Sequence, residues 1–269
     1  MSHHQGKEST MTLTAQLTDA AADFRERMTP GGEGDLARID PEFVERIANF
    51  ALDQVVADTP LLDNRARFLC WTATCLGCGG VDAFRAVVRG ALASDVDPVA
   101  VQEVVYQATA YLGVARTRAF LDAKNEVFEA CGIELPLEPQ ATTTPDYESR
   151  RKGGEAAQVA CFGEHMHGFK DRGNPDYPQI ARWLVTNCFG DWYTRGGLSI
   201  PEREMVTFCF IAAQGGCEAQ LRSHTVGNVQ CGNTREFLIQ VVSSNVPFIG
   251  YPRSLNALAV IEEVTGAKE

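Results

Sequence analysis

The chain has 269 residues, of which 45% are hydrophobic and 22% are charged. This composition is typical of a folded globular protein and excludes disordered, collagen-like and coiled-coil proteins. The net charge of −11, without any long basic run, argues against binding to nucleic acid or to an anionic lipid surface.

No segment approaches the roughly 18 uncharged apolar residues that cross a bilayer, so we expect no membrane association. The first ten residues are polar and lack the apolar centre of a secretion signal. The nine cysteines are odd in number and stand mostly inside apolar runs, which is typical of buried thiols in a reducing compartment. These features predict a cytoplasmic protein.

Apolar residues recur at helical spacing along nearly the whole chain, and the alternation typical of strands is almost absent. Residues 1–34 are predicted to form a mobile leader, and residues 35–131 a first helical domain. Pro41 suits the first turn of its first helix. Further helices are predicted over Arg65–Leu76, Val81–Leu92, Pro98–Tyr111 and Thr117–Phe128.

Residues 132–154 contain three prolines and a run of threonines, a composition that breaks helices and is typical of a linker. A second helical domain is then expected over 155–269. Its predicted helices are Glu155–His167, Pro178–Phe189, Pro201–Ala213, Cys217–Val229, Thr234–Val246 and Arg253–Val264.

The second domain repeats the register of the first. A shift of 137 residues lays Leu61–Val127 over Leu198–Val264 without a gap, and eleven of the 67 aligned positions are identical. Glycines and predicted helix boundaries superpose as well. This self-similarity predicts an internal duplication, with two tandem helical-bundle repeats.

The two copies differ most in polarity near the start of one helix of the second copy. Residues spaced i, i+3, i+4 and i+7 share one helix face, and here they are Cys217, Gln220, Leu221 and His224. Glu204 stands in the preceding helix and can close on the same spot. The first copy carries apolar residues or glycine at the four helix positions, and Arg67 in place of Glu204.

This polar set predicts His224, Glu204 and Cys217 as catalytic residues. A thiol in the first turn of a helix feels the positive end of the helix dipole, which lowers its pKa. An imidazole on the same face can exchange a proton with that thiol or with a ligand. The alternative interpretation makes Cys217 a small buried hydrophobe and His224 a hydrogen-bonded core residue.

Other polar motifs carry less information. Cys75 and Cys78 form a Cys-x-x-Cys pair without a partner pair, so a zinc site is not expected and a chance pairing is favoured over a redox dithiol. His165 and His167 diverge on a helix and are not expected to share a metal. Aromatic residues interpreted as core or interface are Trp71, Tyr106, Tyr111, Trp192 and Tyr193.

Four motifs of the second half point to a known family. They are NCFGDWYTRGGL at Asn187–Leu198, REMVT at Arg203–Thr207, GGCEAQLRSH at Gly215–His224 and VPFIGYPRSLNA at Val246–Ala257. Together they resemble the carboxymuconolactone decarboxylase family, which also contains the alkylhydroperoxidase D-like proteins. The resemblance covers about 155–265 well and about 42–130 more loosely, as in tandem-domain members.

The resemblance implies an all-α helical bundle in each repeat, homotrimers or other homo-oligomers, and catalysis without a metal or organic cofactor. The peroxidase-like branch has a Glu followed by Cys-x-x-Cys-x-x-x-His. Here Cys217 and His224 match that motif, Glu204 lies close to the Glu position, and Gln220 replaces the second thiol. The decarboxylase branch keeps the His without the thiol pair, which is closer to this sequence.

We therefore expect a cofactor-free decarboxylase or related lyase that acts on a small unsaturated lactone or keto acid. His224 is the expected acid, Glu204 its orienting partner or proton relay, and Gln220 the donor to the developing oxyanion. Leu221 and Phe208 are the other predicted substrate-binding residues.

Two alternatives remain open. One is a thiol-dependent peroxidase with Cys217 as the peroxidatic thiol and Cys209 or Cys231 as its resolving partner. The other is a non-catalytic helical module for assembly or ligand sequestration.

Overall fold

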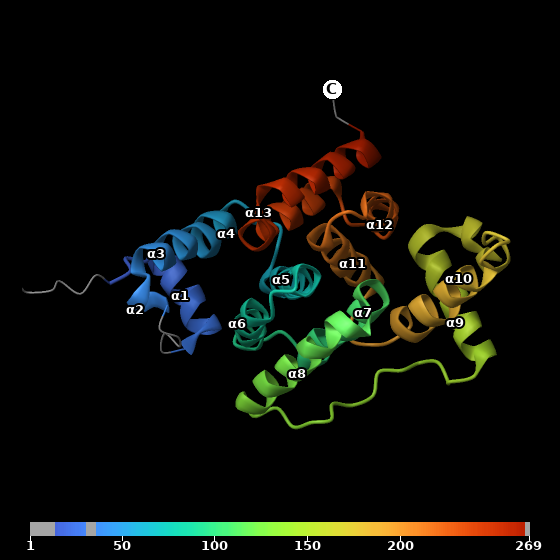
Figure 1. Cartoon of the computed structure of the whole chain (residues 1–269), viewed down its shortest axis with the longest axis horizontal. Helices are drawn as coiled ribbons and strands as arrows, with labels where there is room; N and C mark the ends of the chain where they lie inside the picture. The colour runs from blue at the N-terminus through green and yellow to red at the C-terminus, as the bar shows by residue number, and fades with distance from the viewer. Residues whose placement is uncertain (1–13, 31–35, 267–269) are drawn as a thin grey trace, which may run out of the picture.

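The computed structural model describes residues 14–30 and 36–266, and every regular element within them is a helix (Figure 1). The predicted all-α class is confirmed. The first half contains α1 (Asp19–Met28), α2 (Leu36–Ile39), α3 (Pro41–Asn49), the π-helical η2 (Phe50–Gln54), α4 (Val55–Ala57), α5 (Asn64–Cys78), α6 (Val81–Leu92), α7 (Pro98–Leu112) and α8 (Val114–Ala130).

The second half follows after an irregular segment. It contains α9 (Tyr147–Phe162), the short 3₁₀ turns η3 (Glu164–Met166) and η4 (Phe169–Asp171), α10 (Pro178–Trp183), the π-helical η5 (Leu184–Tyr193), α11 (Ile200–Gln214), α12 (Glu218–Gln230) and α13 (Arg235–Thr265), which is broken at Gly250. None of the described helices is long and apolar enough to cross a membrane.

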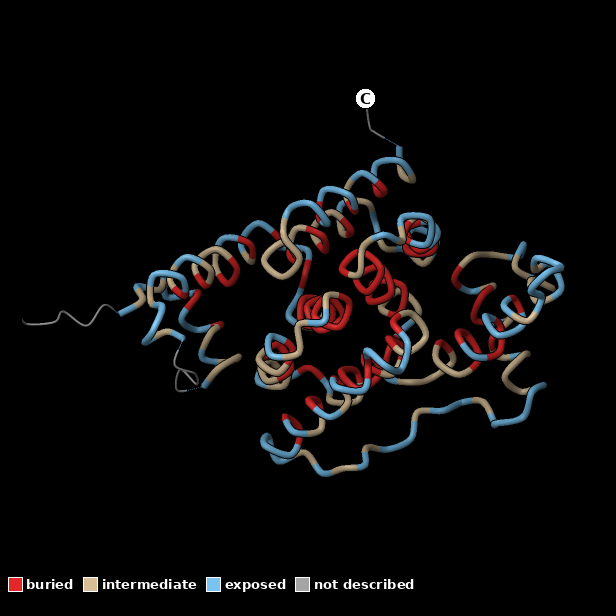
Figure 2. The backbone as a smooth tube through the Cα atoms, in the orientation of Figure 1, coloured by how far each residue is buried: buried red, intermediate tan, exposed pale blue. Residues whose placement is uncertain are grey.

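Helices α5 and α11 form the buried centre of the molecule (Figure 2). They approach so closely that a Cβ on Gly77 of α5 would lie 2.7 Å from the carbonyl oxygen of Phe210 in α11. The indole N–H of Trp71 donates to the hydroxyl of Ser244 in α13 at 2.7 Å. Both halves of the chain therefore contribute to one continuous hydrophobic core.

The helix bounds of the two halves coincide under the 137-residue shift. It carries α6 onto 218–229, where α12 begins at Glu218, and α7 onto 235–249, where α13 runs up to its break. Both copies break at a glycine with positive φ, 78° at Gly113 and 72° at Gly250. The two ends of the molecule also correspond, with α1–α4 at one end and α9 and α10 at the other (Figure 1). These coincidences agree with the duplication, which stays a prediction for the first half of the chain.

Helix α1 differs from the predicted mobile leader over 1–34. Thr18 caps its N-terminus, and the Phe24 ring packs 6.1 Å from the Trp71 ring of α5. Residues 1–13 and 31–34 of the predicted leader lie outside the described residues. Burial of Phe24 and Ala21 and a hydrogen bond from Arg27 to Ser94 at 2.9 Å hold α1 against distant segments, and the local sequence gives little sign of such contacts.

Helix α9 begins at Tyr147, inside the predicted linker 132–154. Asp146 caps it by accepting a hydrogen bond from the backbone N–H of Ser149 at 2.9 Å. Gly154 then lets α9 press against η5, because a Cβ there would lie 1.8 Å from the carbonyl oxygen of Val185. The helix ends at Phe162, before the predicted His167, since Gly163 takes a φ of 94°.

Candidate functional site

Glu204 and His224 lie side by side in the interior of the second half. Nδ1 of His224 is 2.9 Å from Oε2 of Glu204, and the carboxylate oxygen accepts a hydrogen bond from the ring. Glu204 is completely buried, and His224 is 9% exposed. The Asn228 amide donates to the backbone carbonyls of both residues, at 2.9 and 2.7 Å, which holds α11 and α12 at a fixed spacing here. The structure thus brings together two of the three predicted catalytic residues.

A chain of hydroxyl groups supports the other oxygen of the Glu204 carboxylate. The phenol of Tyr193 donates to Oε1 at 2.8 Å, and its oxygen lies 2.7 Å from the hydroxyl of Thr207 and 2.9 Å from that of Tyr111. Burial, together with the nearby charge of Glu204, raises the pKa of Tyr193 well above its ordinary value. Tyr193 therefore stays protonated and acts as a permanent donor to the carboxylate.

The second ring nitrogen of His224, Nε2, has no hydrogen-bond partner among the described residues 14–30 and 36–266. The imidazole is held between the rings of Tyr111 and Phe162, with centroids 5.4 and 5.7 Å away. It forms part of the wall of a cavity of about 420 Å³. The cavity is lined by Gln158, Phe162, His165, Met166, Phe169, Leu184, Phe189, Ser223, His224 and Val226. His224 is therefore fixed at one nitrogen and available to a ligand at the other.

Gly227 makes room for the Glu204 carboxylate. A Cβ at this position would lie 2.5 Å from Oε2 of Glu204 and 2.7 Å from the ring of Phe162. His224 stands one turn earlier in α12, so Gly227 and His224 both face Glu204 from the same side of that helix.

We predict that Gly227→Ala displaces the Glu204 carboxylate and breaks its hydrogen bond to His224. Turnover should fall by about 10-fold or more, the scale of a misplaced catalytic group, while circular dichroism still reports a helical protein. Ser223→Gly on the same helix is not a suitable control, because Ser223 lines the cavity. Gly80→Ala at the start of α6 is better matched, since its added Cβ meets only ordinary contacts of 3.5 Å or more. Equal turnover in both variants would contradict the prediction.

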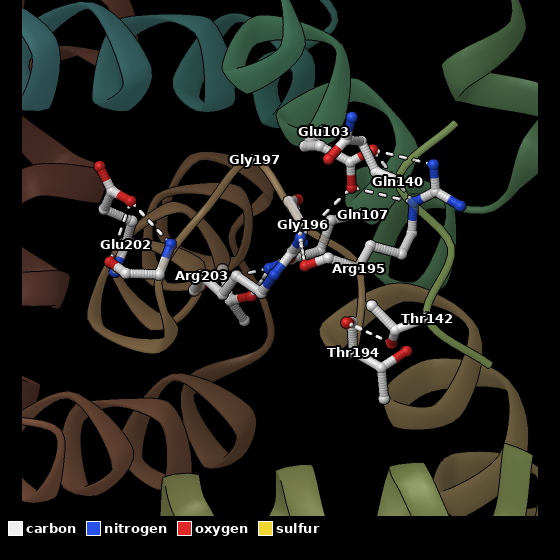
Figure 3. A network of polar contacts seen from close by, with 12 residues as sticks. Glu103, Gln107, Gln140, Thr142, Thr194, Arg195, Gly196, Gly197, Glu202 and Arg203 are labelled. Atoms are coloured by element: carbon white, nitrogen blue, oxygen red, sulfur yellow. Dashed lines mark hydrogen bonds and ion pairs between the residues drawn. The ribbon is translucent and has the colours of Figure 1, made fainter. Parts of the chain in front are cut away.

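A buried ionic network lies next to this site (Figure 3). Glu103 of α7 accepts hydrogen bonds from Arg195 at 2.9 Å and from Arg203 of α11 at 3.2 Å. Arg203 also donates to Oε1 of Gln107 at 2.7 Å, and the Gln107 amide donates to the Thr207 hydroxyl at 2.8 Å. The network therefore connects α7 to the hydroxyl chain that ends on Glu204.

Residues 178–263, which contain Tyr193, Glu204 and His224, match the carboxymuconolactone decarboxylase family. This segment belongs to that family. No curated protein matches the chain. The family resemblance drawn from the motifs is confirmed for residues 178–263, and for the first half of the chain it stays a prediction.

Within the carboxymuconolactone decarboxylase segment, Cys217 lies apart from the cavity of His224. It is the N-cap residue of α12 and lines a separate pocket of about 20 Å³ together with Gly215 and Arg253. The Gln214 amide donates to its Sγ at 3.1 Å. Two helical turns, about 10 Å along the helix, separate Cys217 from His224. Different helices pack at the two positions, α13 against the thiol and α9 against the imidazole.

The predicted substrate-binding residues do not line the His224 cavity. Gln220 is exposed on α12, and Leu221 is buried in the wall of the small Cys217 pocket. Phe208 is completely buried in the core on α11. Helical spacing predicts that Leu221 and His224 share one helix face. In the structure, however, neighbouring helices pack against different parts of that face, so Leu221 and His224 line different pockets.

Neither of the predicted resolving thiols, Cys209 and Cys231, lines the small Cys217 pocket. Cys209 is buried in the core, where the Asn245 amide donates to it at 3.4 Å. Cys231 caps the opposite end of α12, about 20 Å along the helix from Cys217. Cys188 donates to the Tyr111 hydroxyl at 3.7 Å, and burial raises its pKa to about 12. Cys188 is therefore a protonated thiol at neutral pH.

Within the described part of the chain, no group of three or more His, Cys, Asp or Glu residues is arranged to hold a metal ion. His165 lines the His224 cavity, whereas His167 lies at the surface against Glu164, with a contact of 3.1 Å. Cys75 is buried and Cys78 half-buried at the end of α5.

Sequence reasoning missed the residues that surround the Glu204–His224 pair. Tyr111 and Tyr193 were interpreted as core or interface residues, and Phe162 and Gln158 were not singled out. One signal was available, because Tyr193 stands inside the NCFGDWYTRGGL motif and shifts onto Val56 in the first copy. The first copy lacks this hydroxyl as well as counterparts of Glu204 and His224, and this joint loss links Tyr193 to the site.

Proposed function

We propose that the chain is a cofactor-free decarboxylase or related lyase that acts on a small unsaturated lactone or keto acid. One observation carries the proposal. His224 is oriented at Nδ1 by a buried carboxylate, while its Nε2 is free in a cavity large enough for a small molecule. This is the arrangement that a general acid needs.

The proposed reaction uses His224 to protonate carbon. Cleavage of the bond to the carboxylate releases CO₂ and leaves the electron pair on carbon, conjugated with the carbonyl as a dienolate. Nε2 of the imidazolium then delivers its proton to carbon, and solvent restores that proton. Glu204 stabilises the imidazolium, and Tyr193 keeps Glu204 in place and hydrogen-bonded.

The walls of the cavity suit loss of CO₂. Phe162, Phe169 and Phe189 line it, and no Asp, Glu, Lys or Arg is among the described residues that do so. An apolar wall removes water from the substrate carboxylate, and charge that spreads into a dienolate suffers less from that loss. The cavity therefore favours the transition state over the charged ground state.

The peroxidase alternative receives less support from the geometry. A peroxidatic Cys217 needs a base and a resolving thiol, and His224 lines a different cavity. The family match fits either branch, so the alternative is tested together with the main proposal.

Self-association as a homotrimer or another homo-oligomer is part of the proposal. Tyr177, Ile180 and Trp183, at and within α10, are exposed by 50%, 43% and 58%. Such a group of large apolar side chains on one short helix is typical of a surface that another protein subunit covers.

We predict that Cys217→Ser leaves decarboxylation unchanged. The test assays CO₂ release from a panel of small unsaturated lactones and keto acids that carry a carboxylate. The wild type should release CO₂ from at least one of them, and the variant should match it, because the thiol is outside the cavity. A hydroperoxide assay with a dithiol reductant runs in parallel. Peroxide turnover that is lost in Cys217→Ser, without CO₂ release by either protein, would establish the alternative.

A further inference from the structure

A second cavity lies where the irregular segment before α9 meets η5. Its volume is about 320 Å³, and it shares no lining residue with the His224 cavity. This second cavity, the arginine cavity, is lined by Arg150, Asp191, Trp192, Arg195 and residues of the segment 141–145. Its described lining residues therefore include two basic side chains and one acidic side chain.

Arg195 has one unpaired guanidinium nitrogen at the arginine cavity. Its Nε and Nη2 both donate to the carboxylate of Glu103 at 2.9 Å (Figure 3). The guanidinium carbon also lies 5.1 Å from the centre of the Tyr106 ring. These contacts fix the guanidinium group, whereas its Nη1 has no hydrogen-bond partner among residues 14–30 and 36–266. Nη1 is therefore available to a ligand.

Two further donors line the same cavity. Arg150 donates through Nε and Nη2 to Asp191, each at 2.6 Å, and its Nη1 has no partner in the described part of the chain. The indole N–H of Trp192 is buried, and no described residue accepts from it. Buried donors in native proteins almost always have an acceptor. The wall therefore contains N–H groups of three side chains and lacks the oxygen that would accept from them.

The buried charges beside the arginine cavity do not balance. Arg195 and the completely buried Arg203 share the single carboxylate of Glu103. Nε of Arg203 is itself buried without a partner among the described residues. Buried charges in proteins are normally paired, so this network carries one surplus positive charge. Arg150 and Asp191 cancel each other, so the surplus next to the cavity is a single charge.

The first half of the chain lacks these donors. Under the 137-residue shift, the π-helical η2 falls on 187–191, inside η5, so the backbone is alike at this place. The same shift places Val55 at Trp192, Asp58 at Arg195 and Ala66 at Arg203. The helical frame therefore forms without the indole and the two guanidinium groups. A ligand that these groups bind in the second half explains the difference.

We propose that the arginine cavity binds the carboxylate of a small organic acid through Nη1 of Arg150 and Nη1 of Arg195, with the indole N–H of Trp192 as a third donor. One carboxylate supplies both the missing acceptor and the missing negative charge. Guanidinium groups and carboxylates form strong, charge-assisted hydrogen bonds. Ala141, Pro145 and the indole ring offer apolar contacts to the rest of the acid. The site lies outside the His224 cavity and does not depend on the proposed function.

The first test follows the indole N–H resonances by ¹⁵N NMR during a titration with benzoate, which joins one carboxylate to an apolar ring. The chain has three tryptophans, and Trp192→Phe identifies the resonance of Trp192. Benzoate should shift this resonance until it saturates and leave those of Trp71 and Trp183 in place. Benzamide, which has the same ring without the charge, and chloride at equal ionic strength should not shift it. A shift that does not saturate, or that benzamide reproduces, would overturn the proposal.

The second test measures benzoate affinity in variants of the two arginines. Arg195→Met and Arg150→Gln should each weaken binding by about 10-fold or more, the loss expected for a hydrogen bond to a charged group. Arg150→Gln leaves Asp191 with the amide of Asn187 as a donor at 2.8 Å, so this variant keeps its fold even where Arg195→Met does not. Unchanged affinity in folded Arg150→Gln would also overturn the proposal.

Arg222→Gln is the matched control for both variants. Arg222 also donates through Nε and Nη2 to one carboxylate, at 2.7 Å, and it lines neither cavity. It should bind benzoate like the wild type. An equal loss of affinity in Arg222→Gln would mean that benzoate responds to net charge alone, and the arginine cavity would then not be its site.

Inorganic phosphate tests the nature of the anion. Phosphate carries up to two negative charges at neutral pH, against one surplus positive charge, so it should bind more weakly than benzoate at the same ionic strength. Tighter binding of phosphate, lost in Arg150→Gln, would overturn the choice of a carboxylate and assign the cavity to a phosphorylated ligand. None of these measurements involves CO₂ release, so their outcome is independent of the proposed function.

Discussion

His224→Ala is expected to lower kcat for CO₂ release by about 10²- to 10⁴-fold, the usual contribution of a positioned general acid. The variant loses the imidazole. Among the described residues that line the cavity, only His224 pairs one ring nitrogen with a buried carboxylate and keeps the other nitrogen free. The variant also leaves the Glu204 carboxylate buried without its ring partner, although the phenol of Tyr193 still donates to it. Steady-state kinetics on the substrate found in the panel measures the loss.

His167→Ala is the matched control, because His167 is an exposed histidine that binds Glu164 outside the cavity. It should turn over like the wild type. Circular dichroism and size-exclusion chromatography show whether both variants keep their fold and oligomer size. Unchanged turnover in a folded His224→Ala would remove the acid from the mechanism. Absence of any turnover in the wild type would favour the non-catalytic helical module.

Local sequence signals were sufficient for most of the fold. The start of α6 after Gly80 and both ends of α7, at Pro98 and before Gly113, follow from glycine and proline signals that act within a few residues of where they stand. The pairing of Glu204 with His224 was predictable for a different reason. Comparison of two copies shows which polar residues one copy has and the other lacks, and this does not require knowledge of the fold.

The rest of the site depends on contacts between distant segments. Gln158 enters the cavity because Gly154 packs against η5, and neither residue has a local signal for that contact. α1 was assigned to a leader because the contacts that hold it are with distant segments, such as the packing of Phe24 against α5 and the hydrogen bond from Arg27 to Ser94. Cys217 was grouped with His224 because spacing along a helix is visible in sequence, whereas the neighbouring helices that separate them are not.

Glu103→Gln is expected to lower the free energy of unfolding by about 3–5 kcal/mol, the usual cost of removing one partner from a buried ion pair. Glu103 and Arg203 are completely buried, and the side chain of Arg195 is only 14% exposed. A neutral amide would leave two guanidinium groups facing each other without a counter-charge. Burial already lowers the pKa of Arg203, although the carboxylate of Glu103 opposes that change. Urea unfolding followed by circular dichroism measures the difference.

Glu263→Gln provides the control for this prediction. Glu263 also pairs with an arginine through two hydrogen bonds of 2.7 Å, but the side chains of Arg222 and Glu263 are 43% and 55% exposed. Water screens this pair, so its loss should cost at most about 1 kcal/mol. Adding Arg195→Met to Glu103→Gln should restore part of the lost stability, because one of the two uncompensated charges is then gone. Equal losses in Glu103→Gln and Glu263→Gln would mean that water reaches Glu103, and the link from α7 through Gln107 to Tyr193 would then be weaker than its distances indicate.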